Sequence, residues 1–358
     1  MARAARKKTV AKKRRAPSAL KRKSSSHPVI DIHTHIRVPR VMQFMRDNKP
    51  PPQPGMPKPW VPPASASADM QKRQEDAIAA KHLDPKARFP DLDRMGIDIQ
   101  MISYNFPVDC YWMDGETGLQ AARIINDTIA EFAAGAPDRY YGIGSVPLQD
   151  PERSIQELER VTRDLKFRGV LISSLIRDKD LGDPMFKPFW KAAERMGVPI
   201  FIHPQGFSQP DRLAKFFQWN SVAQPLEEAL AMQSLIYEGI MDEFPKLKVC
   251  IHHGGGYLVF YAGRADRAYQ TRPEVSHLKA SPSTYMKKFW YDTVIYNRDM
   301  LEFLAAKVGV DKVMMGTDYP VFMGEDDPVA FVNGAKLTRE DKRKILSSNA
   351  AKLLHIPA

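Results

Sequence analysis

A chain of 358 residues with 43% hydrophobic and 27% charged side chains has an ordinary globular composition, with room for one large α/β domain or two smaller ones. Its formal net charge of +11 comes from residues 1–26, which carry 11 Lys or Arg and no acid. The remaining 42 basic residues balance 42 acidic ones, which argues against a basic nucleic-acid-binding domain.

Residues 1–26 are expected to form a disordered basic tail, because they offer no apolar core. They also lack the hydrophobic stretch of a secretory signal. We favour a functionally silent extension; a patch that contacts nucleic acid or anionic lipid and an organelle-targeting peptide remain as alternatives. Cys110 and Cys250 are too few for a disulfide framework, which favours a reducing, cytoplasmic setting. Apolar runs are strand-length, so no membrane span is expected.

Residues 27–358 alternate between short β-branched runs and longer segments of helical period. Eight strands are predicted, at residues 29–36, 97–104, 140–146, 169–173, 198–203, 248–253, 289–295 and 312–317. Helices are predicted at residues 118–134, 151–165, 185–196, 226–244, 257–269, 300–308 and 338–354. This alternation favours an α/β fold of the (β/α)8 TIM-barrel type. No Gly-rich phosphate loop follows the first strand, which argues against a dinucleotide-binding sheet.

An insertion of about residues 39–90 separates the first two strands. Within it, residues 50–63 hold eight prolines and cannot form a helix. Loops after barrel strands lie on the face where active sites form, so we favour a Pro-rich cap, anchored by Trp60, over a plain surface linker.

Polar side chains occupy the carboxyl ends of several predicted strands. His33 and His35 lie two residues apart on the first strand, so they share one face. His203 ends the fifth strand and Asp318 follows the eighth. Each residue taken singly has a structural explanation, such as capping a turn. Together they form a set that suits a divalent cation, Zn²⁺ or alternatively Mn²⁺.

The sixth strand ends in two adjacent histidines followed by three glycines. Adjacent residues of a strand face opposite ways, so only one of them can reach the centre. The glycines allow a tight turn and leave space for a substrate. We assign a general acid/base role to His253 and a structural role to His252.

From about residue 28 to its end, the chain resembles the amidohydrolase superfamily, and within it the aminocarboxymuconate-semialdehyde decarboxylase-like, amidohydrolase-related group of metal-dependent barrels. The resemblance rests on these segments: IDIHTH at 30–35, MGIDIQ at 95–100, VPLQDPE at 146–152, FIHP at 201–204, FPKLKVCIHHGGG at 244–256 and GTDYPVFMGE at 316–325.

The resemblance implies that His33, His35, His203 and Asp318 bind the metal and that His253 is the catalytic acid/base. It also places Arg264 where the group positions a substrate-binding arginine reached from a neighbouring subunit, which implies a homodimer. Two features depart from the decarboxylase pattern. Gln205-Gly206 replaces a Trp-Asp pair, and no arginine in the insertion matches the second substrate-binding arginine, Arg73 being only nearby.

Three functions follow from these observations. The first is non-oxidative decarboxylation of a carboxylated aromatic or unsaturated small acid, with His253 supplying a proton and Arg264 binding a carboxylate. The second is hydrolysis of an amide, lactone or imide at the same site. The third, which we disfavour, is a non-catalytic protein that contacts nucleic acid through its tail.

Overall fold

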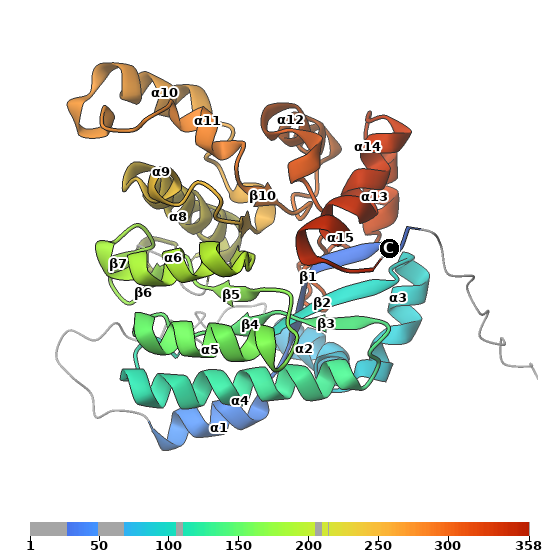
Figure 1. Cartoon of the computed structure of the whole chain (residues 1–358). Helices are drawn as coiled ribbons and strands as arrows, with labels where there is room; N and C mark the ends of the chain where they lie inside the picture. The colour runs from blue at the N-terminus through green and yellow to red at the C-terminus, as the bar shows by residue number, and fades with distance from the viewer. Residues whose placement is uncertain (1–26, 49–67, 105–109, 205–209, 214, 358) are drawn as a thin grey trace, which may run out of the picture.

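The computed structural model describes residues 27–48, 68–104, 110–204, 210–213 and 215–357. Three predicted features lie outside these residues: the basic tail, the Pro-rich segment with Trp60, and the Gln205-Gly206 departure. The chain elsewhere alternates strands with helices, as Figure 1 shows, and the strands of its two larger sheets pair in parallel, which confirms the α/β class. A small antiparallel pair, β6 (Leu175–Ile176) and β7 (Lys179–Asp180), follows β5.

Two parallel sheets form the centre of the molecule. The first contains β1 (Ile30–Ile36), β2 (Ile99–Tyr104) and β3 (Tyr140–Gly142), in that order. The second runs in the order β10, β9, β8, β5, β4; its strands are β10 (Trp290–Tyr291), β9 (Val249–Ile251), β8 (Ile200–Ile202), β5 (Val170–Ile172) and β4 (Gly144–Ser145). Their side chains are almost all buried, as expected of parallel strands covered on both faces.

Backbone contacts link the two sheets at both of their ends. Only Ile143 separates β3 from β4, and its amide donates to the Ile102 carbonyl of β2 at 2.8 Å. On the other side, residues 313–319 form one bridge to Tyr291 of β10 and another to Thr34 of β1. The segment predicted as the eighth strand therefore lies between β10 and β1, although it contains no regular strand of its own.

Strand β1 contains a bulge. Asp31 pairs with Gln100 of β2, but the next register pair is Thr34 with Ile102, so β1 advances three residues while β2 advances two. The extra residue is Ile32 or His33, between the paired residues Asp31 and Thr34. The amide of Ile32 instead bonds to Met315 at 3.0 Å.

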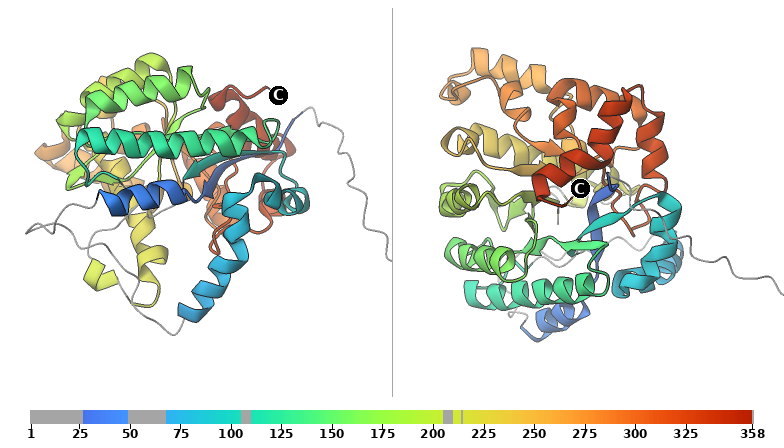
Figure 2. Two further views of the ribbon diagram at one scale, coloured as in Figure 1. Left: turned by 90° about the horizontal axis from the view of Figure 1, so that it is seen from below. Right: turned by 45° about the vertical axis from the view of Figure 1, so that its right-hand side comes forward.

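Helices follow the strands and cover their outer faces (Figures 1 and 2). Those that match predicted helices are α4 (Gly115–Ala134), α5 (Pro151–Arg163), α6 (Lys187–Met196), α8 (Gln224–Tyr237), α9 (Ile240–Glu243), α10 (Ala262–Thr271) and α12 (Arg298–Val308). Local chemistry sets their ends. The Asp150 side chain accepts from the Arg153 amide and caps α5, and Gly197 ends α6 with a φ of 66°. Short helices that the sequence analysis did not predict are α7 (Pro210–Leu213), α11 (Pro282–Met286) and α13 (Pro328–Gly334).

The insertion between β1 and β2 is partly helical, which the sequence did not predict. It contains α1 (Pro39–Asp47) and α2 (Ala68–Leu83), and α3 (Phe89–Met95) leads into β2. Helix α2 projects from the body of the molecule in the left view of Figure 2. Its buried contact is made at its end, where His82 is 1% exposed.

The last predicted helix, residues 338–354, contains a π-helical turn. It divides into α14 (Arg339–Arg343), the π-turn η7 (Lys344–Ser348) and α15 (Asn349–Leu354). Thr338 caps its start by accepting from the Asp341 amide at 3.1 Å. The Ile345 carbonyl of η7 accepts from the Met315 amide at 2.9 Å, which ties this helix to the 313–319 segment.

Among the residues described, no helix combines the length and apolarity needed to cross a membrane. Cys110 and Cys250 are both buried.

Candidate metal and active site

The predicted histidines of β1 meet at its carboxyl end. His33 and His35 are 1% and 2% exposed, and their Nε2 atoms lie 3.1 Å apart. Their rings are perpendicular, with centroids 5.0 Å apart. The i, i+2 spacing therefore places both imidazoles on one side, as the sequence predicted.

His203 and Asp318 complete this cluster. The His203 ring lies 5.1 Å from the His33 ring and 5.0 Å from the His35 ring, measured between centroids. The Asp318 Oδ1 atom is 3.0 Å from Nε2 of His35 and 3.4 Å from Nε2 of His33. One donor atom from each of His33, His203, His253 and Asp318 falls within 4.8 Å of the others. The strand ends therefore bring all the predicted ligand residues together.

In each predicted histidine ligand the Nδ1 atom is hydrogen-bonded. Nδ1 of His33 donates to Asp292 Oδ2 at 2.6 Å, and Nδ1 of His35 donates to the Tyr104 carbonyl at 3.0 Å. Nδ1 of His203 donates to the Pro204 carbonyl at 3.0 Å. These bonds place the ring proton on Nδ1 and leave the Nε2 lone pair free, which is the arrangement that metal-binding histidines adopt. The residues present thus fit a divalent cation.

His253 approaches the same cluster from the turn after β9. Its Nδ1 bonds to Glu228 Oε1 of α8 at 2.7 Å, and its Nε2 lies 3.7 Å from Asp318 Oδ2. Both His253 and Asp318 have left-handed backbones, with φ of 45° and 60°. Such a conformation is uncommon for residues other than glycine and is concentrated at functional sites.

Burial and neighbouring charges divide the site into neutral and charged groups. Burial lowers the pKa of His33, and it lowers that of His203 well below the usual range, so both rings are neutral. Burial opposes ionisation of Asp318, but the adjacent histidines outweigh it and hold the pKa of this carboxyl well below its usual value. A carboxylate beside neutral imidazoles is the charge state that a metal ion requires.

The His253–Glu228 pair is protonated. Burial alone would lower the pKa of His253, but the Glu228 and Asp318 carboxylates raise it well above its usual value. Burial raises the pKa of Glu228 to about 8. The pair therefore keeps a proton at neutral pH and can present it to a reacting atom through His253.

His252, unlike His253, stacks directly on the His33 ring. The two rings are 3.7 Å apart between centroids and inclined by 11°. Neither ring nitrogen of His252 has a hydrogen-bond partner within the described part of the chain. Burial lowers its pKa well below the usual range, so it packs as a neutral ring.

A buried polar network supports the strands behind the site. Asp31 Oδ2 accepts from Thr317 Oγ1 at 2.6 Å and from Gln100 Nε2 at 3.0 Å. Arg88 is fully buried and donates to the His35 carbonyl and to Gln100 Oε1. Burial raises the pKa of Asp31 to about 7. This network links β1, β2 and the 313–319 segment immediately behind the donor residues.

Aromatic side chains lie on the loops that follow two of the donor residues. Phe217 comes after His203 and Phe322 after Asp318; their ring centroids are 5.8 Å apart. Trp219 contacts Phe217 at a centroid distance of 4.8 Å. Phe322 remains 39% exposed. These rings offer flat apolar surface on segments that follow two of the donor residues.

Two arginines considered for substrate binding, Arg264 and the nearby candidate Arg73, are not part of the donor cluster. Arg264 is exposed on α10, and Arg73 is exposed on α2; within the described residues neither makes an ion pair.

The sequence analysis missed Asp292 and Glu228, which orient His33 and His253. Asp292 follows β10, so the rule that identified the other strand-end residues could have found it. Glu228 lies within a helix, and no local pattern marks it.

Comparison with known proteins places this chain in a family. The amidohydrolase family profile matches residues 30–356. The 2-amino-3-carboxymuconate-6-semialdehyde decarboxylase of Dictyostelium discoideum is 35% identical over 274 residues, which cover 76% of each protein.

Two solved structures share the fold. The 5-carboxyvanillate decarboxylase of Sphingomonas paucimobilis is 26% identical with a TM-score of 0.77, and the alignment covers 92% of this chain and 99% of that one. The dihydroxybenzoic acid decarboxylase of Polaromonas sp. JS666, solved with bound manganese and the inhibitor 2-nitroresorcinol, is 23% identical with a TM-score of 0.78; the alignment covers 93% of this chain and 98% of that one. With nearly its whole described length matched, the chain belongs to the amidohydrolase family.

Proposed function

We propose that this protein is a metal-dependent, non-oxidative decarboxylase of a small aromatic or unsaturated carboxylic acid. One observation carries the proposal: three imidazoles, each held at Nδ1, direct their Nε2 atoms toward a shared region that also contains the Asp318 carboxylate. The decarboxylases to which the chain is similar supply the reaction class.

The proposed architecture is a closed (β/α)8 barrel formed by residues 27–358. The backbone contacts of Ile143 with Ile102 and of the 313–319 segment with β1 and β10 support closure of the two sheets. In such a barrel the carboxyl ends of the strands face one rim, where active sites form. The described helices of the insertion, α1 and α2, are part of the proposed cap.

His33, His35, His203 and Asp318 would hold one divalent ion. Imidazole and carboxylate donors suit both Zn²⁺ and Mn²⁺, and manganese is the ion in the similar Polaromonas structure. When bound, the ion supplies Lewis acidity that draws electron density from a substrate oxygen. Asp292 and the Tyr104 carbonyl keep two of these rings oriented for the ion.

His253 would supply the proton in the chemical step. The bond between the ring or alkene carbon and the carboxylate breaks, CO₂ leaves, and the electron pair stays on carbon. The proton on His253 Nε2 then passes to that carbon, while Glu228 keeps Nδ1 hydrogen-bonded. Positioned proton transfer of this kind contributes about 10²–10⁴-fold in rate. Solvent reprotonates the imidazole before the next turnover.

Substrate binding would use an aromatic wall and a cation. Phe217 and Phe322 can pack against the faces of a planar substrate. Arg264 is exposed on α10, so a contribution to a substrate carboxylate requires a neighbouring subunit. A homodimer is therefore part of the proposal. A cytoplasmic location is also part of it, supported by the low cysteine content of two residues in 358.

The test is to incubate the Mn²⁺- or Zn²⁺-loaded protein with a panel of hydroxybenzoates and lactones. Release of CO₂ from a carboxylated substrate, with hydrolytic products absent, is the expected result. In D₂O the product should carry deuterium at the carbon that lost CO₂. Ring opening of a lactone without CO₂ release would replace the decarboxylase by the hydrolase alternative.

His253→Gln provides the matched catalytic variant. We expect at least 10²-fold loss of turnover with metal content unchanged. His277→Gln, which alters an exposed histidine bonded to the Tyr237 carbonyl, serves as the control and should leave turnover unchanged. Near-normal turnover by His253→Gln would refute the assigned role, and loss of metal would instead make His253 a ligand.

A further inference from the structure

A pocket of about 390 Å³ lies at the amino end of β1, away from the candidate active site. His27 and Val29, just before β1, form one wall. The helix that runs through α14 and η7 forms another. His33 and His35 lie at the opposite, carboxyl end of β1. The pocket is therefore separate from the metal donors.

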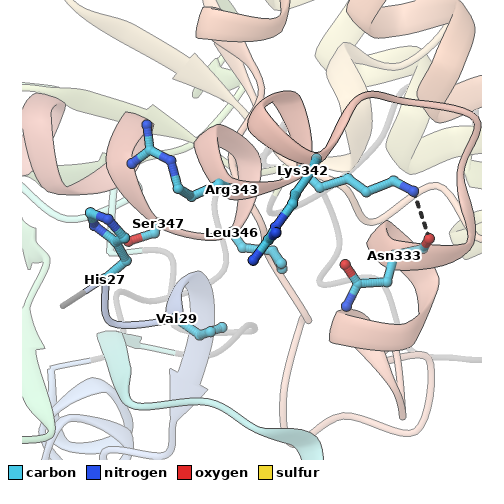
Figure 3. A pocket seen from close by; sticks show the side chains of 8 residues that line it. His27, Val29, Asn333, Lys342, Arg343, Leu346 and Ser347 are labelled. Carbon is cyan, nitrogen blue, oxygen red and sulfur yellow. Dashed lines mark hydrogen bonds between the residues drawn. The ribbon is translucent and has the colours of Figure 1, made fainter. Parts of the chain in front are cut away.

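Cations line this pocket and no acidic side chain does. Arg339, Lys342 and Arg343 contribute three positive charges. Arg343 Nε donates to Glu340 at 2.9 Å. Lys342 Nζ donates to the Asn333 carbonyl at 2.8 Å, the bond drawn in Figure 3. Arg339 makes no ion pair with any residue that the structure describes. Glu340 offsets the charge of Arg343, and the charges of Arg339 and Lys342 leave the pocket net positive.

A buried hydroxyl faces the same pocket without a partner. Ser347 is 3% exposed, and its Oγ makes no hydrogen bond within the described chain. It belongs to the π-turn η7, and such turns often occur at functional sites. In Figure 3 its side chain lies next to His27 at one end of the pocket. A buried hydroxyl is costly unless a partner accepts or donates, so a ligand oxygen here is favourable.

We propose that this pocket binds the phosphate group of a small organic phosphate monoester. A phosphate dianion has three terminal oxygens, which match guanidinium, ammonium and hydroxyl donors better than the two oxygens of a carboxylate do. Val29 and Leu346 supply apolar surface for the organic part. The volume is within the range of small-molecule sites. This binding is independent of the proposed decarboxylase activity.

The test is calorimetric titration of the metal-loaded, full-length protein at constant ionic strength. Glycerol 2-phosphate, inorganic phosphate and acetate are the probes, with chloride as the background anion. We expect saturable binding of glycerol 2-phosphate and weaker or no binding of acetate. Equal binding of inorganic phosphate means that the phosphate group alone is recognised; tighter binding of the ester means that its organic part contributes. Either result supports the site.

Charge and hydroxyl variants locate the binding. Arg339→Glu combined with Lys342→Glu should weaken glycerol 2-phosphate binding by at least about tenfold. The matched control, Lys191→Glu with Lys287→Glu, makes the same change in net charge at exposed positions on α6 and after α11, and should bind normally. Ser347→Ala should weaken binding several-fold without lowering the Tm, because its hydroxyl has no internal partner to lose.

The proposal is overturned by any of three results. One is that neither phosphate binds saturably at concentrations up to about 10 mM, because a weaker dissociation constant would not indicate a specific site. Another is unchanged binding by the Arg339→Glu, Lys342→Glu protein. The third is an equal loss in the Lys191→Glu, Lys287→Glu control, which would indicate a general charge effect. Should the double glutamate variant fail to fold, Arg339→Gln with Lys342→Gln is measured in its place.

Discussion

Replacing Asp292 with asparagine tests whether the bond to His33 prepares that ring for a metal ion. Asp292 Oδ1 accepts from the Gly254 and Val294 amides at 3.0 and 3.1 Å, while Oδ2 accepts from His33 Nδ1 at 2.6 Å. In the variant, the two amides hold the remaining oxygen at the Oδ1 position. The new NH₂ group must therefore face His33.

An NH₂ donor cannot accept from Nδ1–H. The His33 proton is then favoured on Nε2, the nitrogen that should bind the ion, and the ring carries the wrong tautomer. Loss of such an orienting contact weakens metal binding by about 10–100-fold, which is about 1.4–2.7 kcal/mol. We expect an effect of this size on Mn²⁺ affinity, since both side chains are fully buried and water cannot replace the bond.

The assay is competition between the apoprotein and a chelator for Mn²⁺, with metal content measured after dialysis. Asp299→Asn is the matched control, because Asp299 is an exposed aspartate at the start of α12. Circular dichroism and thermal melting check that both variants are folded. Mn²⁺ affinity of the Asp292→Asn protein within about twofold of the original would refute the reasoning, as would an equal loss in the Asp299→Asn protein.

Three further predictions follow from the same contacts. Glu228→Gln removes the carboxylate that raises the pKa of His253, so protonated His253 is lost at lower pH, and the high-pH limb of kcat should move to lower pH with metal content unchanged; an unmoved limb in a pH–rate profile would contradict this. His82 is buried with its pKa lowered to about 3, so the unfolded state gains a proton below pH 6.5 that the folded state does not, and stability is lost as the pH falls from 6.5 toward 3. The difference in unfolding free energy between the His82→Leu protein and the original protein should therefore be about 2 kcal/mol more favourable to the variant at pH 5 than at pH 8. Urea denaturation at both pH values measures this difference, and the same difference at pH 5 and pH 8 would count against the prediction. Removal of metal by a chelator should abolish decarboxylation, and Mn²⁺ or Zn²⁺ should restore it; full activity of metal-free protein would rule out the proposed role of His33 and Asp318.

The strands and the main site residues could be predicted because their signals are local. A buried parallel strand is a short apolar run, and polar residues at its carboxyl end stand out, as His203 and Asp318 do. Asp292 follows β10 in the same way, so the same local signal marks it, although the sequence analysis did not use it. Glu228 lies in a helix, and its role arises from a tertiary contact with His253 across 25 residues.

Other features depend on interactions that sequence periodicity does not report. The exposed helix α2 has only weak amphipathic patterning, so it gave no clear helical signal within the insertion. The π-turn within the last helix keeps the same overall periodicity and was expected as continuous α-helix. The segment around residue 315 was predicted as a strand, but its backbone makes only isolated bridges. Its amides are shared among Tyr291 of β10, the helix at Ile345 and His33 of β1.

The bulge in β1 has a consequence for transplanting this centre into another scaffold. Deleting Ile32 would restore regular pairing with β2 and turn every preceding side chain of the strand to the other face. Asp31 would then point away from Gln100 and Thr317, although the His-Thr-His letters would be intact. A designer who copies the tripeptide must therefore copy the irregular hydrogen-bonding around it as well.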